Sequence, residues 1–261
     1  MRKDAVADLD VMVGGELSIR GRLLSASNAT FLGTVTRDGV DVECVYKPIA
    51  GERPLWDFPD ETLAMREVAA YVVSEAIGWD LVPPTVLREG PFGRGMAQAW
   101  REPDENQSPV DVVPAGREPE GYLHVLDAVG DDEEPITVVH ENTAPLRRMA
   151  VFDALVNNAD RKGGHVLAMA DGHRHGVDHG VTFHVEPKLR TVLWGWAGNP
   201  LDAQDAGAVE SLLDGDLSRL LGKWLNAHEV EAFRVRAERL LEVGRMPLPT
   251  AGWRSIPWPV F

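Results

Sequence analysis

The sequence predicts an α+β protein with two lobes, because strand-forming patterns dominate its first part and helix-forming patterns dominate its last part. A stretch rich in Pro, Glu and Asp at residues 101–120 separates the two kinds of pattern. We therefore expect a small, β-rich N-terminal lobe over residues 1–100, built from an antiparallel sheet and one long helix. A larger and mostly helical C-terminal lobe is expected over residues 101–261.

Strand patterns fill residues 16–47 of the first lobe, after a short helical or loose lead-in. Turn-forming residues interrupt the apolar positions at 25–28 and 37–39, which predicts three antiparallel strands. A helix is then expected from about Asp60, its N-cap, to Ile77, with Gly78 as its stop. Two further strands are expected at 85–87 and 95–100.

The second lobe is expected to begin with a hairpin over residues 121–140, followed by a helix over 144–157. From 202 to 243 the apolar residues recur at helical spacing. The tail beyond Pro247 is rich in Pro and Trp, and we expect it to lie across the surface. Short strands are expected between the helices, at 166–169, 174–177 and 182–183.

Charge and composition narrow the classes of partner. The net charge of −15 disfavours nucleic acid and anionic membranes, whereas a nucleotide that brings its own magnesium remains compatible. No apolar run is long enough for a transmembrane helix, and the first ten residues do not resemble a secretory signal. Cys44 is the only cysteine, which favours a reducing, cytoplasmic setting, and its strand pattern predicts a small buried side chain.

The densest polar cluster of the chain runs from Asn157 to His165, between a predicted helix and an apolar strand. Polar groups enclosed in this way must be hydrogen-bonded or bind a ligand. Asp178 follows thirteen residues after His165, again in a strand–turn context. Two such turns would bring Asp160, His165 and Asp178 to one point. Phosphoryl transfer needs this set: one carboxylate orients and deprotonates the acceptor hydroxyl, and the other groups hold magnesium. The alternative is that these residues only cap a helix and fill an ordinary turn.

A nucleotide site also needs a cation beside the phosphates. Lys47 ends a strand of alternating apolar residues, so it would stand at the edge of a cleft. Glu67 lies four residues from both Leu63 and Tyr71, on the apolar stripe of the predicted helix. A carboxylate in that position needs a counter-charge, which predicts a Lys47–Glu67 ion pair. The alternative is a solvated lysine and an edge glutamate.

The two polar turns carry a family resemblance. One motif runs from Asn158 to His165 and contains Asp160-Arg161; the other is Val177-Asp178-His-Gly180. The two motifs resemble the catalytic and metal-binding loops of the phosphatidylinositol 3-/4-kinase-like superfamily. HipA-type kinases show a related layout. From about Glu16 to Trp194 the chain also resembles an actinobacterial family described as phosphatidylinositol-kinase-like. The resemblance implies a bilobal, protein-kinase-like fold that binds ATP and Mg²⁺ (or Mn²⁺) between its lobes. By the same resemblance Asp160, with Arg161 and Lys47, is catalytic, and Asp178 is the main metal ligand.

The resemblance also places the remaining nucleotide contacts. In such folds a loop between the first two strands covers the phosphates, which here implies contacts from Ser25, Ser27 and Asn28, with a plain hairpin turn as the alternative. The interlobe hinge, whose backbone meets adenine, would fall at Gln98-Ala99-Trp100.

One residue departs from the family pattern. The family carries Asn five residues after the catalytic aspartate, as second metal ligand, whereas this chain has His165. Imidazole suits softer ions than Mg²⁺. The leading hypothesis is an ATP-dependent kinase, which transfers the γ-phosphate to a protein Ser/Thr or a small hydroxyl acceptor, or to itself, without stable membrane association. A nucleotide-binding pseudokinase and a metal-dependent hydrolase with a histidine-rich turn are the competing hypotheses.

Overall fold

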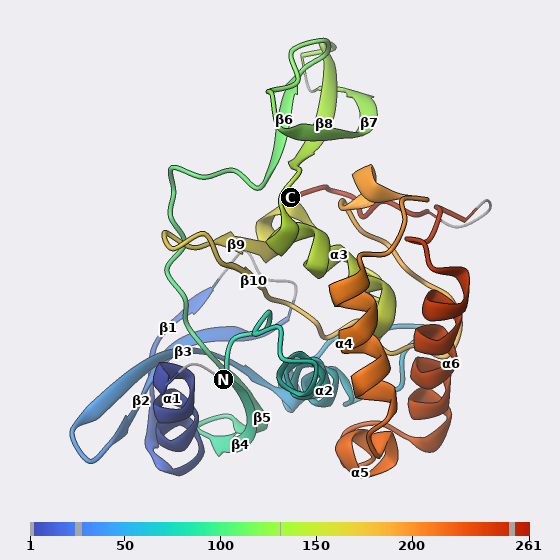
Figure 1. Ribbon diagram of the computed structural model, residues 1–261. Helices are drawn as coiled ribbons and strands as arrows, with labels where there is room; N and C mark the ends of the chain where they lie inside the picture. The colour runs from blue at the N-terminus through green and yellow to red at the C-terminus, as the bar shows by residue number, and fades with distance from the viewer. Residues whose placement is uncertain (1–2, 24–27, 131, 251–253) are drawn as a thin grey trace.

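The computed structural model describes residues 3–23, 28–130, 132–250 and 254–261. It is a mixed α/β protein in which every strand pair is antiparallel (Figure 1). The helices are α1 (Lys3–Gly14), α2 (Leu63–Ala76), α3 (Ala144–Val156), α4 (Ala203–Leu213), α5 (Leu217–Leu221) and α6 (Ala227–Val243). Within the described ranges, no helix combines the length and the apolar character that crossing a bilayer requires.

A five-stranded sheet in the order β1-β2-β3-β5-β4 forms the N-terminal part. One face of β3 buries Val42, Cys44 and Tyr46 against a core to which α1 contributes Met12. Because side chains alternate along a strand, Lys47 projects from the opposite face. The predicted three-strand meander and the buried Cys44 are confirmed. The strands are β1 (Glu16–Leu23), β2 (Thr30–Arg37), β3 (Val40–Pro48), β4 (Thr85–Gly90) and β5 (Gly93–Ala99).

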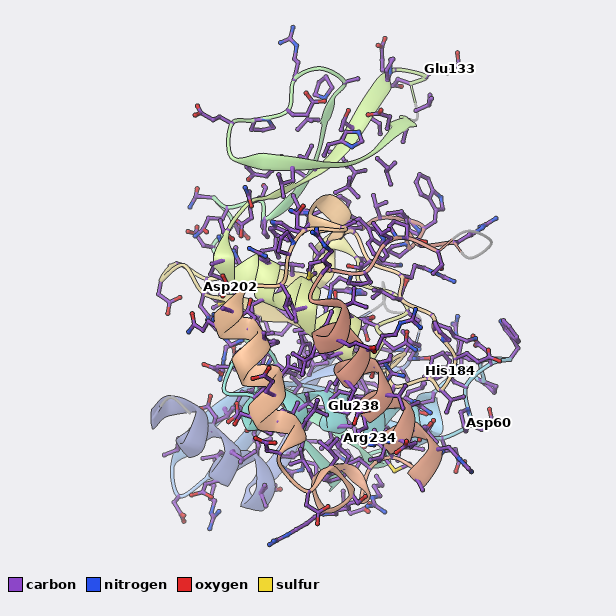
Figure 2. All side chains as sticks on the ribbon, turned by 45° about the vertical axis from the view of Figure 1, so that its right-hand side comes forward. Asp60, Glu133, His184, Asp202, Arg234 and Glu238 are labelled. Carbon is purple, nitrogen blue, oxygen red and sulfur yellow. The ribbon has the colours of Figure 1, made fainter. Side chains whose placement is uncertain are left out.

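Helix α2 begins three residues later than predicted, so Asp60 is not its N-cap. Asp60 lies exposed at the periphery of the molecule (Figure 2), and Glu61 after it adopts a left-handed backbone (φ 61°) that cannot continue into a helix. The carboxylate of Glu52 caps the helix instead, because it accepts hydrogen bonds from the backbone N–H groups of Leu63 (3.1 Å) and Ala64 (2.7 Å).

A second sheet, in the order β6-β8-β7, stands at the top of Figure 1. The predicted hairpin is confirmed as β7 (Tyr122–Val129) and β8 (Pro135–Glu141). The prediction missed β6 (Val110–Pro114), which pairs with β8. Its four residues before Pro114 lie in the Pro- and acid-rich stretch, where they are too few to give a strand signal.

Helices α3, α4 and α6 pack together beside α2 and share the largest core (Figure 1). Asp202 caps the upper end of α4 (Figure 2), where it accepts a hydrogen bond from Gln204 N (2.8 Å). Two short strands, β9 (Val166–Ala168) and β10 (Arg174–Gly176), form a hairpin as predicted. The predicted strand at 182–183 is absent from this described region, since Phe183 has a left-handed backbone (φ 59°).

Candidate functional site

Three residues from distant parts of the chain meet at the ammonium group of Lys47. Its Nζ donates to Glu67 Oε1 on α2 (2.8 Å) and to Asp178 Oδ1 (2.6 Å), two residues beyond β10. The predicted Lys47–Glu67 pair is therefore formed, and Asp178 adds a second carboxylate to it. The sheet, helix α2 and the loop after β10 are thus joined at one charged group.

The electrostatics of this cluster follow from its burial. Burial raises the pKa of Glu67, which is only 2% exposed, while Lys47 opposes that rise. Desolvation also acts on Lys47, yet attraction to Asp178 and Glu67 outweighs it and raises the Lys47 pKa. Attraction to Lys47 in turn holds the pKa of Asp178 well below its ordinary value. Glu67 also accepts a hydrogen bond from His179 N (2.8 Å), which stabilises its charged form.

A cavity of about 210 Å³ opens beside this cluster. Asp160 lines it together with Lys47, Glu67 and Asp178, so both aspartates of the predicted pair face one space. Burial raises the pKa of Asp160, and its backbone N–H donates to Asn158 Oδ1 (3.0 Å), which fixes the turn. Lys47 thus shares a small cavity with these three carboxylates, and Glu52 and Arg53 also line it.

His165 lies at the edge of the same cluster. Its Nε2 is 3.5 Å from Asp178 Oδ2, which leaves both within reach of one ion. Burial lowers the pKa of His165 to about 4, so its imidazole is neutral at pH 7 despite the neighbouring carboxylate. Neutral imidazole nitrogen and carboxylate oxygen are ligand types that divalent metals accept.

The His165 shift predicts a pH-dependent stability. Unfolded His165 binds a proton near pH 6.5 and folded His165 only near pH 4, so between these values the unfolded state binds more protons. The free energy of unfolding should therefore fall as the pH is lowered from about 6.5 to about 4. Urea unfolding of His165→Asn should show a smaller loss between pH 7 and pH 5 than the wild type. An equal loss, with exposed His228→Asn as the control, would assign the effect to other groups.

Arg161 does not reach the cavity, contrary to its predicted catalytic role. Its guanidinium is 0% exposed and binds Asp153 Oδ1 (2.9 Å) on α3. It also donates to the carbonyls of His165 (3.2 Å) and Val177 (2.9 Å) and contacts His179 Nε2 (2.6 Å). Arg161 therefore links the loop of Asp160 to the loop of Asp178 on the interior side, so it is a residue that positions these two aspartates.

The predicted hinge residues also lie differently. The side chain of Gln98 is buried and donates to Thr85 Oγ1 (2.8 Å) on the neighbouring strand, and Gln98 is not among the residues that line the cavity. The N–H groups of Ala99 and Trp100 donate to the carbonyls of Pro84 and Glu43 (2.8 Å each), which removes them as donors to a base. The Trp100 side chain does line a separate hollow of about 420 Å³ on the face of β1–β3.

Of the predicted phosphate loop, Ser25 and Ser27 lie outside the described residues, and Asn28 lines the cavity. Asn28 Oδ1 accepts from Arg53 N (2.9 Å), which holds the 48–55 segment beside Lys47. Sequence reasoning missed Lys162, whose Nζ is 3.9 Å from Asp160 Oδ2. Its position two residues after Asp160 was the available signal.

Comparison with known proteins gives one close relative. The chain is 52% identical over 263 residues to Protein Rv2133c of Mycobacterium tuberculosis (strain ATCC 25618 / H37Rv), and the match covers 96% of this chain and 94% of that protein. No protein-family model matches the sequence.

Proposed function

This chain belongs to the same family as Protein Rv2133c, and from the geometry of its cavity we propose that it is an ATP- and divalent-metal-dependent phosphotransferase with a kinase-like, bilobal layout. The observation that carries the proposal is the contact of Lys47 with both Glu67 and Asp178, beside Asp160. A strand lysine held by a helix glutamate, next to a metal-binding and a proton-accepting aspartate, is the set that protein kinases use.

The charges around the cavity favour a metal–nucleotide over a free polyphosphate. The carboxylates that line it outnumber the cations: they are Glu52, Glu67, Asp160 and Asp178, against Lys47 and Arg53 in the lining and Lys162 nearby. These carboxylates would repel a polyphosphate alone. A divalent ion compensates the negative charge of the phosphates and that of the carboxylates. Asp178 is 48% exposed, so one oxygen is open to such an ion, and His165 stands beside it. The donors present therefore fit a divalent metal, with Asp178 and His165 as its ligands.

Each side chain has a defined task in the proposed reaction. A divalent ion, when bound, neutralises charge on the phosphates. Asp160 orients the acceptor hydroxyl and takes its proton; its raised pKa makes it a better base than an exposed aspartate. Lys47 binds phosphate oxygens, and Glu67 fixes the direction of its ammonium group. Lys162 is close enough to Asp160 to bind the transferred group.

The contact between Lys47 and Asp178 suggests how the site switches to its loaded form. Asp178 Oδ1 is engaged by Lys47 in the free protein. An ion at Asp178 would compete for that carboxylate and release Lys47 toward the phosphates, while Glu67 keeps hold of it. Metal and nucleotide are therefore expected to bind cooperatively.

A substitution of Lys47 tests the proposal. Lys47→Met alone would leave Glu67 buried without its counter-charge, so we would use the double variant Lys47→Met/Glu67→Gln. With ATP and Mg²⁺ or Mn²⁺, wild-type protein should transfer γ-phosphate to itself, a protein Ser/Thr or a small hydroxyl compound. The double variant should lose at least about 100-fold of that rate. Lys223→Met, on the surface beside Trp224, is the matched control.

The competing hypotheses give different outcomes. Nucleotide binding without turnover under any divalent ion would support a pseudokinase. This hypothesis is motivated by His165, which stands where the resembled family has asparagine. In that case His165→Asn is the variant in which Mg²⁺-dependent turnover should appear. Activity that needs no nucleotide and does not depend on Lys47 would contradict the proposal and support a hydrolase.

A further inference from the structure

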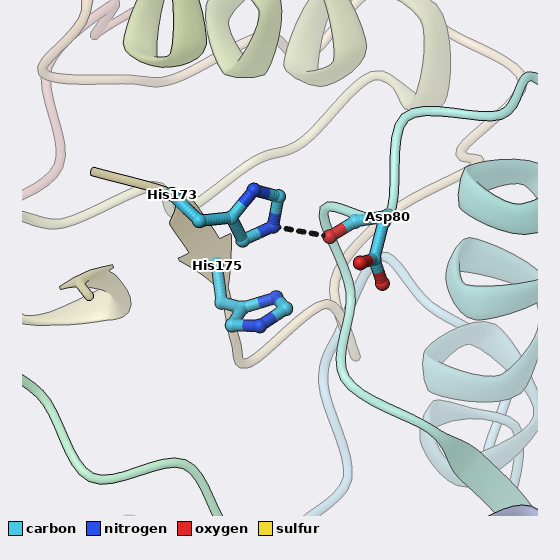
Figure 3. Close-up of side chains that lie close together, drawn as sticks. All are labelled: Asp80, His173 and His175. Atoms are coloured by element: carbon cyan, nitrogen blue, oxygen red, sulfur yellow. Dashed lines mark hydrogen bonds between the residues drawn. The ribbon is translucent and has the colours of Figure 1, made fainter. Parts of the chain in front are cut away.

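A second polar cluster lies outside the cavity, between the segment after α2 and the strand β10. Asp80, His173 and His175 each place one potential ligand atom there, and these three atoms lie within 4.8 Å of one another (Figure 3). His175 is buried, whereas Asp80 and His173 are partly exposed. The cluster is therefore anchored in the interior and open to solvent on one side.

The fold holds the two segments in register. Gly176 N donates to Leu81 O (2.7 Å), which lays β10 along the 80–81 segment. His173 and His175 are two residues apart on an extended segment, so both rings project from one face, with centroids 4.4 Å apart. His173 Nε2 donates to the carbonyl of Asp80 (2.7 Å), as the dashed line in Figure 3 shows.

Asp80 itself has an unusual backbone. Its φ is 52°, in the left-handed region that side chains other than glycine adopt at a cost. This conformation turns the chain after Trp79 and directs the Asp80 carboxylate toward the two rings, as Figure 3 shows. Strain of this kind concentrates at binding sites, where the surrounding structure over-determines it.

We propose that Asp80, His173 and His175 form a binding site for Zn²⁺. Two imidazole nitrogens and one carboxylate oxygen form the ligand set of zinc sites that have three protein ligands. Water or another ligand occupies the fourth position of such sites. The set is poor for Mg²⁺, which prefers oxygen ligands, and its two imidazoles favour Zn²⁺ more than the single imidazole and carboxylate of the cavity do.

Zinc binding requires a rearrangement at His173. Because His173 Nε2 faces Asp80, an ion at that nitrogen replaces the hydrogen bond to the Asp80 carbonyl, and the neutral ring carries its proton on Nδ1. The bound ion cross-links the chain after α2 to β10, where His175 lies three residues before Asp178. Zinc should therefore stabilise the junction on which the Asp178 loop is mounted.

The test is calorimetric titration of chelator-treated, full-length protein with ZnCl₂, followed by Co²⁺ titration monitored by visible absorption. We expect one ion per chain that depends on Asp80 and His173, a higher thermal midpoint with zinc, and d–d bands typical of a tetrahedral or five-coordinate site. His173→Ala and Asp80→Asn should each weaken zinc binding by more than about 10-fold. Asparagine tolerates a left-handed backbone, so Asp80→Asn keeps the turn.

Two controls locate the ion. His124→Ala removes an exposed histidine elsewhere and should bind zinc as the wild type does, whereas Asp178→Asn removes a metal ligand of the cavity and should keep the zinc that depends on Asp80 and His173. The proposal is overturned if wild-type protein binds no zinc, or if His173→Ala and Asp80→Asn bind it unchanged. It is also overturned if Asp178→Asn abolishes binding, because the ion would then belong to the cavity. None of these outcomes depends on phosphotransfer.

Discussion

Replacing Asp178 by asparagine is expected to lower the rate of γ-phosphate transfer by at least about 100-fold, because the change removes the charge of the proposed metal ligand and keeps the shape of the side chain. Asp178 has a left-handed backbone (φ 60°), which asparagine also tolerates. Lys47 retains Glu67 as its partner, so the free energy of unfolding should change by about 1 kcal/mol or less for this half-exposed pair.

The same substitution should change nucleotide affinity in a direction that distinguishes the loss of a negative charge from a loss of folded protein. In the wild type, metal-free ATP would meet the four carboxylates that line the cavity with Lys47, which are Glu52, Glu67, Asp160 and Asp178. Removing one of them lessens the repulsion, so ATP should bind Asp178→Asn more tightly than the wild type when EDTA is present. Added Mg²⁺ or Mn²⁺ should tighten binding to the wild type far more than to the variant. Both constants are measurable by calorimetry.

Asp38→Asn is the matched control for this experiment. Asp38 has a similar left-handed backbone (φ 52°), but it lies exposed in the turn between β2 and β3. It makes the same chemical change far from the cavity, and transfer and metal dependence should remain at wild-type values. Full activity of Asp178→Asn would refute the assignment of Asp178 as metal ligand, whatever the acceptor is.

The sequence carried enough information to predict which strand, helix or turn carries each of the charged groups Lys47, Glu67, Asp160 and Asp178. Alternation along β3 placed Lys47 opposite Cys44, and helical spacing placed Glu67 on the apolar stripe of α2; both features depend only on local periodicity. The two polar turns with Asp160 and Asp178 were likewise visible, because so many polar residues between buried elements need partners.

The errors arose where the outcome depends on contacts across the fold. The backbone N–H groups of Ala99 and Trp100 are bound by the carbonyls of Pro84 and Glu43, and no local pattern shows which carbonyl such an N–H will meet. The N-terminus of α2 is capped by Glu52, eleven residues before Leu63, whereas capping rules consider only adjacent residues. Arg161 stands inside a catalytic-loop motif, yet its surroundings are set by α3 and by the loop after β10.

Arg161→Met is therefore expected to act through stability, with a loss of about 3–5 kcal/mol in the free energy of unfolding. The substitution leaves the buried carboxylate of Asp153 without its counter-charge and removes the Arg161 donor from the carbonyl of Val177. The carbonyl of His165 loses one of its two donors and keeps the N–H of Val177 (3.0 Å). Urea unfolding at pH 7 measures the loss. Asp153→Asn should also destabilise the protein, and the double variant should lose less than the sum of the two, because the pair acts as a unit.

Arg234→Met gives the matched control, since Arg234 pairs with Glu231 and Glu238 on the solvent-facing side of α6 (Figure 2). This substitution should leave the unfolding midpoint nearly unchanged. Amide hydrogen exchange separates the positioning role of Arg161 from a general loss of stability. Because Arg161 links two loops to α3, exchange in Arg161→Met should rise most at residues 160–166 and 176–180, beyond the rise shared by the whole chain. A uniform rise would mean that Arg161 stabilises the fold without holding Asp160 and Asp178 in place.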